Sequence, residues 1–420
     1  MITMRTIRRA VTRTIAGTAL LAASAACSDK FVSVTNPDVI DAATVDPMSG
    51  ATMMALSAQQ NYATALGFLA LYGAWFSEEA NVSDTFPTRN EFGFRIVSDL
   101  NTSLNPDVWQ RISLAAAGAK AVLDLELPSP TTNINLARAA TFRGFAILQM
   151  ATDFCTTSLS SGPELTTTQG LDSAIFWFSR GIDVGKANAT ADGIALANAS
   201  LVGRARAKLQ KGDKAGAAAD AAAVPTGFQY DLRYTDDLTN RVRLGNQLYF
   251  YTFDRSSVSV APWYRTSDPR VPYKGPGVTK LNPQDAVPGG FYEQTKFPGY
   301  AAPIRLASKL EADYIAAEAT GDATTQLALI NARRLANAKP AYAGATDAAS
   351  LLTELYNQRA YEFYLEGKRV ADFRRSPASV TSMTPAGAPY FKPGYGNVGT
   401  QTCYPLPRVE RDNNPNMKTN

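Results

Sequence analysis

The sequence predicts a mainly α-helical protein that is interrupted by one irregular, loop-rich insert. Apolar residues recur at spacings of three and four through most of the chain, as they do on helices that bury one face. Two segments also repeat the same plan of a helix, a Gly-Asp pair and a second helix. Residues 225–303 lack this periodicity and contain nine prolines and seven glycines, which favour turns and short strands. The predicted architecture is therefore a helical scaffold with a single insertion.

The first 26 residues are predicted to be an export signal. Four arginines precede a mostly apolar run, Ile15–Ala26, which is too short to span a bilayer. The run ends in small residues directly before Cys27, a pattern that resembles a lipoprotein processing site. We expect Cys27 to be lipidated and residues 27–48 to form a tether and lead-in. The alternative is ordinary cleavage that leaves a free thiol.

Charge and composition exclude several functions. The chain has a formal net charge of +4, but four arginines and no acidic residues lie in the export signal, so the remaining chain is neutral. A neutral protein has no electrostatic basis for binding nucleic acid. The chain has no histidine, which excludes Ser-His-Asp and Cys-His catalysis and histidine-containing zinc sites. Since there is also no glycine-rich phosphate loop and no metal-ligand spacing, we expect no cofactor and no metal.

Two cysteines remain beyond the processing site. Cys155 and Cys403 both lie in loop-like sequence. In an exported protein such a pair is a candidate disulfide, and two unrelated buried thiols are the alternative.

Helical periodicity begins near residue 49 and continues to residue 224. The predicted helices of this first part of the scaffold are Ala51–Phe76, Asn105–Leu127, Ile134–Thr152, Leu171–Ala187, Ala195–Lys211 and Lys214–Ala223. The repeated plan occurs in Leu201–Ala223 and again in Leu306–Ala338. In each copy glycine is expected to end the first helix and aspartate to cap the second. These units resemble degenerate tetratricopeptide hairpins, but we favour the interpretation that they are plain helical hairpins of a scaffold.

The scaffold is expected to return over residues 304–375, before a loop-rich tail at 376–420. Leu352, Leu355, Tyr356, Arg359 and Phe363 form one stripe of an amphipathic helix, and Gly367 is expected to end that helix.

Charges are dense just after this stripe. The group Arg369, Asp372 and Arg375 either contacts a partner or forms a partly buried network that fixes the tail. We favour the network.

The C-terminal part of the chain resembles the closing signature of the SusD/RagB family. Glu366, Gly367, Arg369, Asp372 and Arg375 match its Glu-Gly-x-Arg-x-x-Asp-x-x-Arg run. The matching residues of its proline-rich tail are Pro405, Pro407, Glu410, Asn414, Pro415 and Asn416. Further landmarks are Val108-Trp109, the helix at 137–145, Arg305–Ala319 and Asn331-Ala332-Arg333. The chain departs from the family pattern at Ser308, where a glutamate is usual, and at Asn357-Gln358.

The resemblance implies a SusD-like helical scaffold that carries an irregular ligand-binding face. It also implies a non-catalytic lipoprotein of the outer membrane, lipid-anchored and surface-exposed. Such a protein would capture an oligomeric nutrient, either glycan or peptide, and deliver it to a TonB-dependent SusC-like transporter. The alternative from another class is a tetratricopeptide-like adaptor of the cell envelope that binds a protein.

Aromatic residues outside the regular helical pattern are the main ligand candidates. Flat rings bind sugar rings by burying C–H surface, although ordinary loop packing is the alternative for each of them. Trp75 and Trp263 are the foremost candidates, whereas Trp109 is expected in the core. The full candidate set is Trp75, Asn81, Asp84, Tyr249, Tyr251, Trp263, Tyr264, Arg265 and Tyr292, with Arg89 and Asp268 nearby.

One acidic group requires a separate interpretation. Glu78, Glu79 and Asp84 lie close in sequence, and a carboxylate pair across a substrate would serve glycoside hydrolysis. Adjacent residues tend to point apart, so we expect no catalytic residues here.

Overall fold

Long helices dominate the computed structural model, which describes residues 47–417. The export signal, Cys27 and the tether up to residue 46 lie outside the described residues. The longer helices are α2 (Pro47–Phe76), α4 (Gln110–Leu123), α5 (Ile134–Asp153), α6 (Thr167–Asn188), α7 (Ala191–Lys211), α8 (Lys214–Ala222), α11 (Lys309–Thr320), α12 (Ala323–Ala336) and α13 (Ala348–Glu362). The shorter ones are α3 (Pro87–Gly93), α9 (Arg241–Leu244), α10 (Gln247–Tyr249), α14 (Arg369–Arg375) and α15 (Arg408–Asn413). The predicted mainly α-helical class is confirmed.

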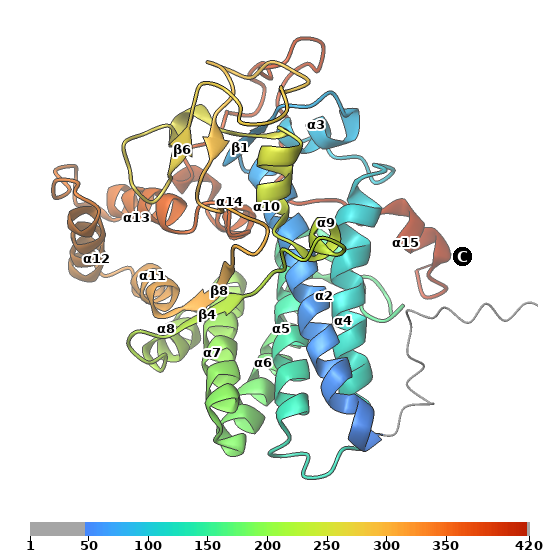
Figure 1. The fold of residues 1–420 in the computed structure, drawn as a ribbon. Coiled ribbons are helices and arrows are strands. Elements are labelled where there is room, and N and C mark those ends of the chain that lie inside the picture. The colour runs from blue at the N-terminus through green and yellow to red at the C-terminus, as the bar shows by residue number, and fades with distance from the viewer. Residues whose placement is uncertain (1–46, 418–420) are drawn as a thin grey trace, which may run out of the picture. The chain divides into compact units, whose positions relative to one another are not determined.

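Helix α5 lies at the centre of a bundle. It packs against α2, α4, α6 and α7, and every residue of it except Ile134 is buried. Figure 1 shows these five helices running along roughly one direction. The ring of Phe178 on α6 fits between Gly144 and Gly203, where an added Cβ would lie 2.7 Å and 2.4 Å from it. Glycine at these two positions therefore allows the close approach of α5, α6 and α7.

Both Gly-Asp pairs behave as predicted. Gly212 ends α7 with φ of 90°, and Gly321 ends α11 with φ of 63°. The side chain of Asp213 accepts a hydrogen bond from Gly216 N at 2.9 Å. Asp322 accepts one from Thr325 N at 2.7 Å and so caps α12. These local signals fix both turns because they need no tertiary partner.

Four predicted helix starts were wrong by several residues, and the first of them is α2, which begins at Pro47 and not at Ala51. Helices α6 and α7 begin four residues earlier than expected, because Thr166 and Thr190 supply N-caps. The predicted helix from Leu306 begins instead at Lys309, after the strand β8 (Ile304–Ser308). Ser308 caps this helix by accepting a hydrogen bond from Glu311 N at 3.2 Å. The residues before it are extended because they pair with a strand far away in sequence.

The start of α4 and the end of α13 also differ from the prediction. Before α4, residues Leu104–Trp109 form a π-helical turn. Helix α13 ends at Glu362, five residues before the predicted stop at Gly367. The chain turns at Leu365, where φ is 58° and the backbone N donates to Glu79 Oε1 at 2.9 Å. A tertiary hydrogen bond thus accompanies the early end of this helix.

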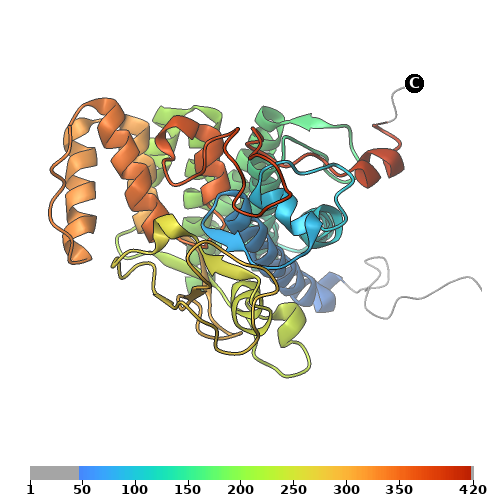
Figure 2. The ribbon, with the colours of Figure 1, turned by 90° about the horizontal axis from the view of Figure 1, so that it is seen from above.

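The insert is held to the scaffold by short antiparallel strands. Its strands are β4 (Gln229–Leu232), β5 (Val258–Val260), β6 (Tyr273–Lys274) and β7 (Glu293–Gln294). Strand β4 pairs with β8, and β5 pairs with β1 (Ala80–Val82), whereas β6 and β7 pair with each other. The remaining pair, β2 (Thr156–Thr157) and β3 (Leu165–Thr166), belongs to the scaffold. Much of the insert, with β1 and α3, lies at one end of the bundle (Figures 1 and 2).

The tail is fastened to the bundle beyond the end of α5. Cys155 and Cys403 form a disulfide with a Cα–Cα distance of 5.1 Å. Next to it, Cys155 N donates to Tyr404 O at 2.8 Å and Tyr404 N donates to Asp153 O at 2.7 Å. Trp109 is a core residue, as expected, and its Nε1 donates to Glu410 Oε2 at 3.1 Å.

The charges at α13 and α14 form a buried network, not an exposed cluster. Arg359 and Arg375 both donate to Asp372, at distances from 2.9 to 3.2 Å. Arg369 donates to Tyr356 O and to Ser382 Oγ, and Ser382 belongs to the tail. The network therefore connects α13, α14 and the tail.

Candidate functional site

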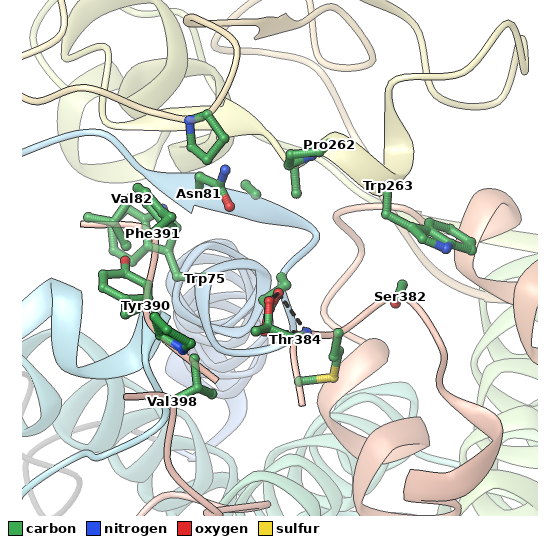
Figure 3. Close-up of a pocket in the computed structure, with 17 residues that line it drawn as sticks. Trp75, Asn81, Val82, Pro262, Trp263, Ser382, Thr384, Tyr390, Phe391 and Val398 are labelled. Carbon is green, nitrogen blue, oxygen red and sulfur yellow. Dashed lines mark hydrogen bonds between the residues drawn. The ribbon is translucent and has the colours of Figure 1, made fainter. Parts of the chain in front are cut away.

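A cavity of about 300 Å³ opens among the end of α2, strand β1, the insert and the tail. Figure 3 shows its labelled residues around one space, with Trp263 on one side and Tyr390 and Phe391 on the other. The scaffold contributes Trp75, Glu78, Ala80, Asn81, Val82 and Gly93. The insert contributes Ala261, Pro262, Trp263 and Pro288, and the tail contributes Ser382, Met383, Thr384, Pro389, Tyr390, Phe391 and Val398. The cavity thus joins three parts of the chain that are distant in sequence.

The pairing of β1 with β5 brings two of the candidates together. Asn81 lies opposite Ser259 in the ladder, and Ala80 lies opposite Val260. The chain leaves β5 into a short 3₁₀ turn, Pro262–Tyr264, which places Trp263 at the cavity. Trp75 reaches the same cavity from the last turn of α2. The strand pair therefore unites Asn81 and Trp263, which are 182 positions apart in the sequence.

Two buried donors at this cavity have no hydrogen-bond partner in the described protein. They are Trp75 Nε1 and Asn81 Nδ2, on side chains whose exposed fractions are 0% and 7%. The Trp75 ring is held edge-on against Tyr72, with centroids 5.0 Å apart, and against Tyr251, at 6.2 Å. An unpaired buried donor is costly, and a ligand or a water that supplies an acceptor would remove this cost.

Trp263 is only half-buried and lines the cavity. Tyr361 of α13 stacks on it, with ring centroids 5.0 Å apart and an angle of 13° between the planes. Arg270 in turn lies 5.2 Å from the centre of the Tyr361 ring. This stack fixes the orientation of Trp263, as a binding platform requires.

The acidic residues do not form a facing pair. Glu78 lines the cavity, but it forms an ion pair with Arg95 at 2.8 Å and accepts hydrogen bonds from Thr384 N and Oγ1 (Figure 3). Glu79 is fully buried and accepts from Leu365 N, and burial raises its pKa to about 7. Asp84 forms an ion pair with Arg89 at 2.7 Å. The three carboxylates are thus committed to three different partners.

The other candidates lie beside the cavity and do not line it. Tyr264 is fully buried, as an edge-on neighbour of Trp263. Arg265 donates to Pro288 O and its guanidinium lies 4.1 Å from the centre of the Tyr292 ring. Since Pro288 is a cavity residue, Arg265 acts by holding the wall.

Two further candidates lie farther along the insert. Tyr249 packs against Tyr300 and Phe253, with ring centroids 4.9 Å apart in each case. Tyr251 is buried and lies under Arg89, whose guanidinium is 5.1 Å from the ring centre. The two polar residues predicted near these aromatics both form ion pairs within the protein. Arg89 pairs with Asp84, and Asp268 pairs with Arg270 at 2.8 Å.

Sequence reasoning missed the contribution of the tail. Tyr390 and Phe391 line the cavity, as do Met383 and Val398. Tyr390 OH donates to Asn90 Oδ1 at 3.3 Å, and Lys392 Nζ donates to Asp84 O at 2.6 Å, so the tail is fixed to the scaffold on both sides of Phe391. The adjacent aromatics in a loop-like segment were the only local signal.

Residues 47–417 contain neither a metal-binding cluster nor a candidate membrane span. In that range no cluster of acidic or cysteine side chains is arranged to hold a metal ion. No helix there is long and apolar enough to cross a membrane.

Comparison with known proteins identifies the fold. No family model matches the chain, and no curated protein is significantly similar to it in sequence. Among solved structures it is similar to a SusD superfamily protein from Parabacteroides distasonis, with a TM-score of 0.65, 16% identity, and coverage of 90% of this chain and 99% of that one. A SusD-like carbohydrate-binding protein from Bacteroides vulgatus gives a TM-score of 0.66 at 14% identity, covering 87% and 96% of the two chains.

A laminarin-binding SusD-like protein gives a TM-score of 0.63 at 14% identity, with 86% and 96% coverage. The helical scaffold with its irregular cavity-bearing end thus has the fold of SusD/RagB proteins. The resemblance seen in the closing signature is confirmed at the level of the fold.

Proposed function

We propose that this protein is a non-catalytic SusD/RagB-type lipoprotein that captures an oligomeric nutrient at the cavity around Trp75, Asn81 and Trp263. A glycan is the favoured ligand and a peptide the second. Support comes from the fold, which the chain shares with a SusD-like carbohydrate-binding protein and with a laminarin-binding protein.

The main structural support for this proposal is the set of chemical groups in the cavity wall. It combines an oriented, half-buried tryptophan with two unpartnered donors, Trp75 Nε1 and Asn81 Nδ2. Its one carboxylate, on Glu78, is neutralised by Arg95. An aromatic face next to uncharged polar groups suits a neutral, hydroxyl-rich ligand, because C–H surface packs on the ring while hydroxyls pair with the amide and indole groups.

Anchoring and delivery extend this proposal beyond the cavity. Lipidation at Cys27 would hold the protein on the outer membrane, with residues 27–48 as a tether. The captured ligand would then pass to a TonB-dependent SusC-like transporter. Support for both steps comes from the sequence before Cys27 and from the shared fold.

Titration calorimetry with neutral oligosaccharides and with peptides tests capture. We expect Trp263→Ala to weaken oligosaccharide binding about tenfold, which corresponds to about 1.4 kcal/mol, because the platform is lost. Phe176→Ala is the matched control, since Phe176 is an exposed aromatic residue on α6, far from this cavity in sequence. If neither oligosaccharides nor peptides bind the intact protein, capture at this cavity is wrong.

A pull-down from solubilised outer membranes tests delivery. The tagged lipoprotein is expected to recover a TonB-dependent transporter. Cys27→Ala should release the protein from membranes in fractionation while leaving ligand affinity unchanged. Recovery of no transporter with an intact, membrane-bound protein would contradict delivery but not capture.

A further inference from the structure

A second cavity, of about 260 Å³, lies between α4, α5, the β2–β3 turn and α15. Its polar lining includes Arg143 from α5, Ser113 from α4 and Glu410 from α15. Its apolar lining includes Leu114, Met150 and Leu159. None of these residues lines the cavity around Trp263.

Arg143 is buried without a counter-charge. Its exposed fraction is 5%, and its one hydrogen bond in the described protein runs from Nη1 to Ala116 O at 2.7 Å. Nε has no partner, and within residues 47–417 no carboxylate lies within ion-pair distance. The guanidinium rests against Trp177, 5.1 Å from the ring centre. Burial lowers the pKa of Arg143, as expected for a cation that has lost water without gaining an anion.

The unpaired guanidinium is unusual beside its neighbours. Arg138, five residues earlier on α5, pairs with Asp192, and Arg206 on α7 pairs with Glu311. A buried charge is normally paired, because an uncompensated one costs several kcal/mol. A carboxylate or a similar anion from outside the chain would supply the counter-charge that Arg143 lacks among the described residues.

Glu410 supplies the opposite charge at the same cavity. One of its oxygens, Oε2, accepts from Trp109 Nε1 at 3.1 Å, and Oε1 has no partner among the described residues. Although both Arg143 and Glu410 line this cavity, they do not form an ion pair with each other. A simple anion would be attracted by one and repelled by the other. A ligand that carries both charges satisfies both.

We propose that this second cavity binds a small zwitterion, a free α-amino acid with an apolar side chain. Its carboxylate would pair with Arg143, its ammonium group with Glu410, and its side chain would contact Leu114, Met150 and Leu159. A fork of guanidinium donors matches a planar carboxylate, and the apolar lining beside the two charged groups suits an apolar side chain.

Titration calorimetry of the mature protein with L-leucine tests this proposal. L-Leucine is expected to bind, whereas leucinamide, which lacks the carboxylate, and N-acetyl-leucine, which lacks the ammonium group, should each bind at least tenfold more weakly. Trp263→Ala should leave L-leucine affinity unchanged, which separates this site from the proposed capture site.

Glu410→Gln provides the decisive variant, because the amide oxygen still accepts from Trp109 and folding should be retained. It should reduce the preference for L-leucine over N-acetyl-leucine at least fivefold. Arg143→Gln should reduce the preference for L-leucine over leucinamide at least fivefold, because the partner of the carboxylate is lost. Asp412→Asn, on the exposed side of α15, is the matched control and should change neither ratio.

Three results would overturn the proposal. They are the absence of L-leucine binding, equal affinity for L-leucine and N-acetyl-leucine, and unchanged ligand preference in a folded Glu410→Gln protein.

Discussion

The buried ion network at α13 and α14 and the open cavity around Trp263 differ in their polar groups: the network is built on charged pairs, whereas the cavity wall presents uncharged donors. In the network, Arg359 and Asp372 are each 4% exposed and bind each other through two hydrogen bonds. Burial alone would raise the pKa of Asp372, but Arg359 and Arg375 hold it at about 2. In the cavity wall, Trp75 and Asn81 each keep a buried donor unpaired.

This difference indicates that the two regions have different roles, one in fixing the backbone and one in binding a ligand. In the network, ion pairs to Asp372 fix the backbone, although Arg359 Nη1 and Arg369 Nε have no partner among the described residues. Unpaired donors leave free energy to be gained when a ligand arrives. The two regions meet where Arg369 donates to Ser382 of the cavity wall and where Leu365 N donates to Glu79. The network thus fixes the backbone segments that carry part of the cavity wall.

The largest expected effect comes from breaking the network. Asp372→Ala leaves Arg359 buried without its partner and should lower the free energy of unfolding by about 3–5 kcal/mol. Urea denaturation measures this. Asp124→Ala is the control, because Asp124 and Lys120 form an exposed pair that is worth about 1 kcal/mol or less. Equal losses of unfolding free energy for the two substitutions would show that the network does not stabilise the fold more than an exposed ion pair does.

The disulfide should have the next largest effect. It joins positions 248 residues apart and fastens the tail that forms one cavity wall. The double substitution of Cys155 and Cys403 by serine should lower the free energy of unfolding by about 2–4 kcal/mol. Denaturation with and without reductant measures the same quantity in the unaltered protein. If neither treatment changes stability, the tail is held by its other contacts.

The junction between the two regions should respond to pH. Burial raises the pKa of Glu79 from 4.5 to about 7. The folded protein therefore holds this proton more tightly than the unfolded chain does. Between about pH 4.5 and 7 its contribution to the free energy of unfolding falls as the pH rises, by about 3 kcal/mol in all. Glu79→Gln should remove this dependence, because glutamine does not titrate. Parallel stability curves for the two proteins would contradict the assignment.

The smallest effect is expected at the aromatic platform. Tyr361→Leu removes the ring on which Trp263 stacks and should weaken oligosaccharide binding by about 0.5–1.5 kcal/mol, with little change in stability. Tyr361→Phe keeps the stack and serves as the control in calorimetry. A loss of affinity in both proteins would assign the effect to the hydroxyl instead.

Much of the scaffold could be predicted from the sequence, because its signals are local. The turns at Gly212-Asp213 and Gly321-Asp322 were predicted with their caps, since a left-handed glycine and a capping aspartate act within four residues. The strand β8 was missed because Ile304–Ser308 is extended only through its pairing with β4. The mainly helical class needed no such partner.

The candidate site was predicted in part, and the untested roles of its residues remain predictions. Trp75, Asn81 and Trp263 meet at one cavity, whereas Tyr264 is buried beside it. Residue type marked the aromatic candidates, but it does not encode which ring faces a cavity and which faces the core. Tyr390 and Phe391 were missed because no sequence spacing relates them to β1, about 310 residues earlier.

By itself, the sequence determined the helical class, the two Gly-Asp turns and the closing signature that resembles SusD/RagB proteins, because each depends on neighbours within a few residues. Only the tertiary structure decided where α13 ends, which charges are paired and which side chains line the two cavities. These features depend on contacts such as Leu365 N to Glu79 and the disulfide from Cys155 to Cys403, which join residues hundreds of positions apart. Interactions between neighbouring residues determine the secondary structure, whereas contacts between distant segments determine the cavities and the buried ion network.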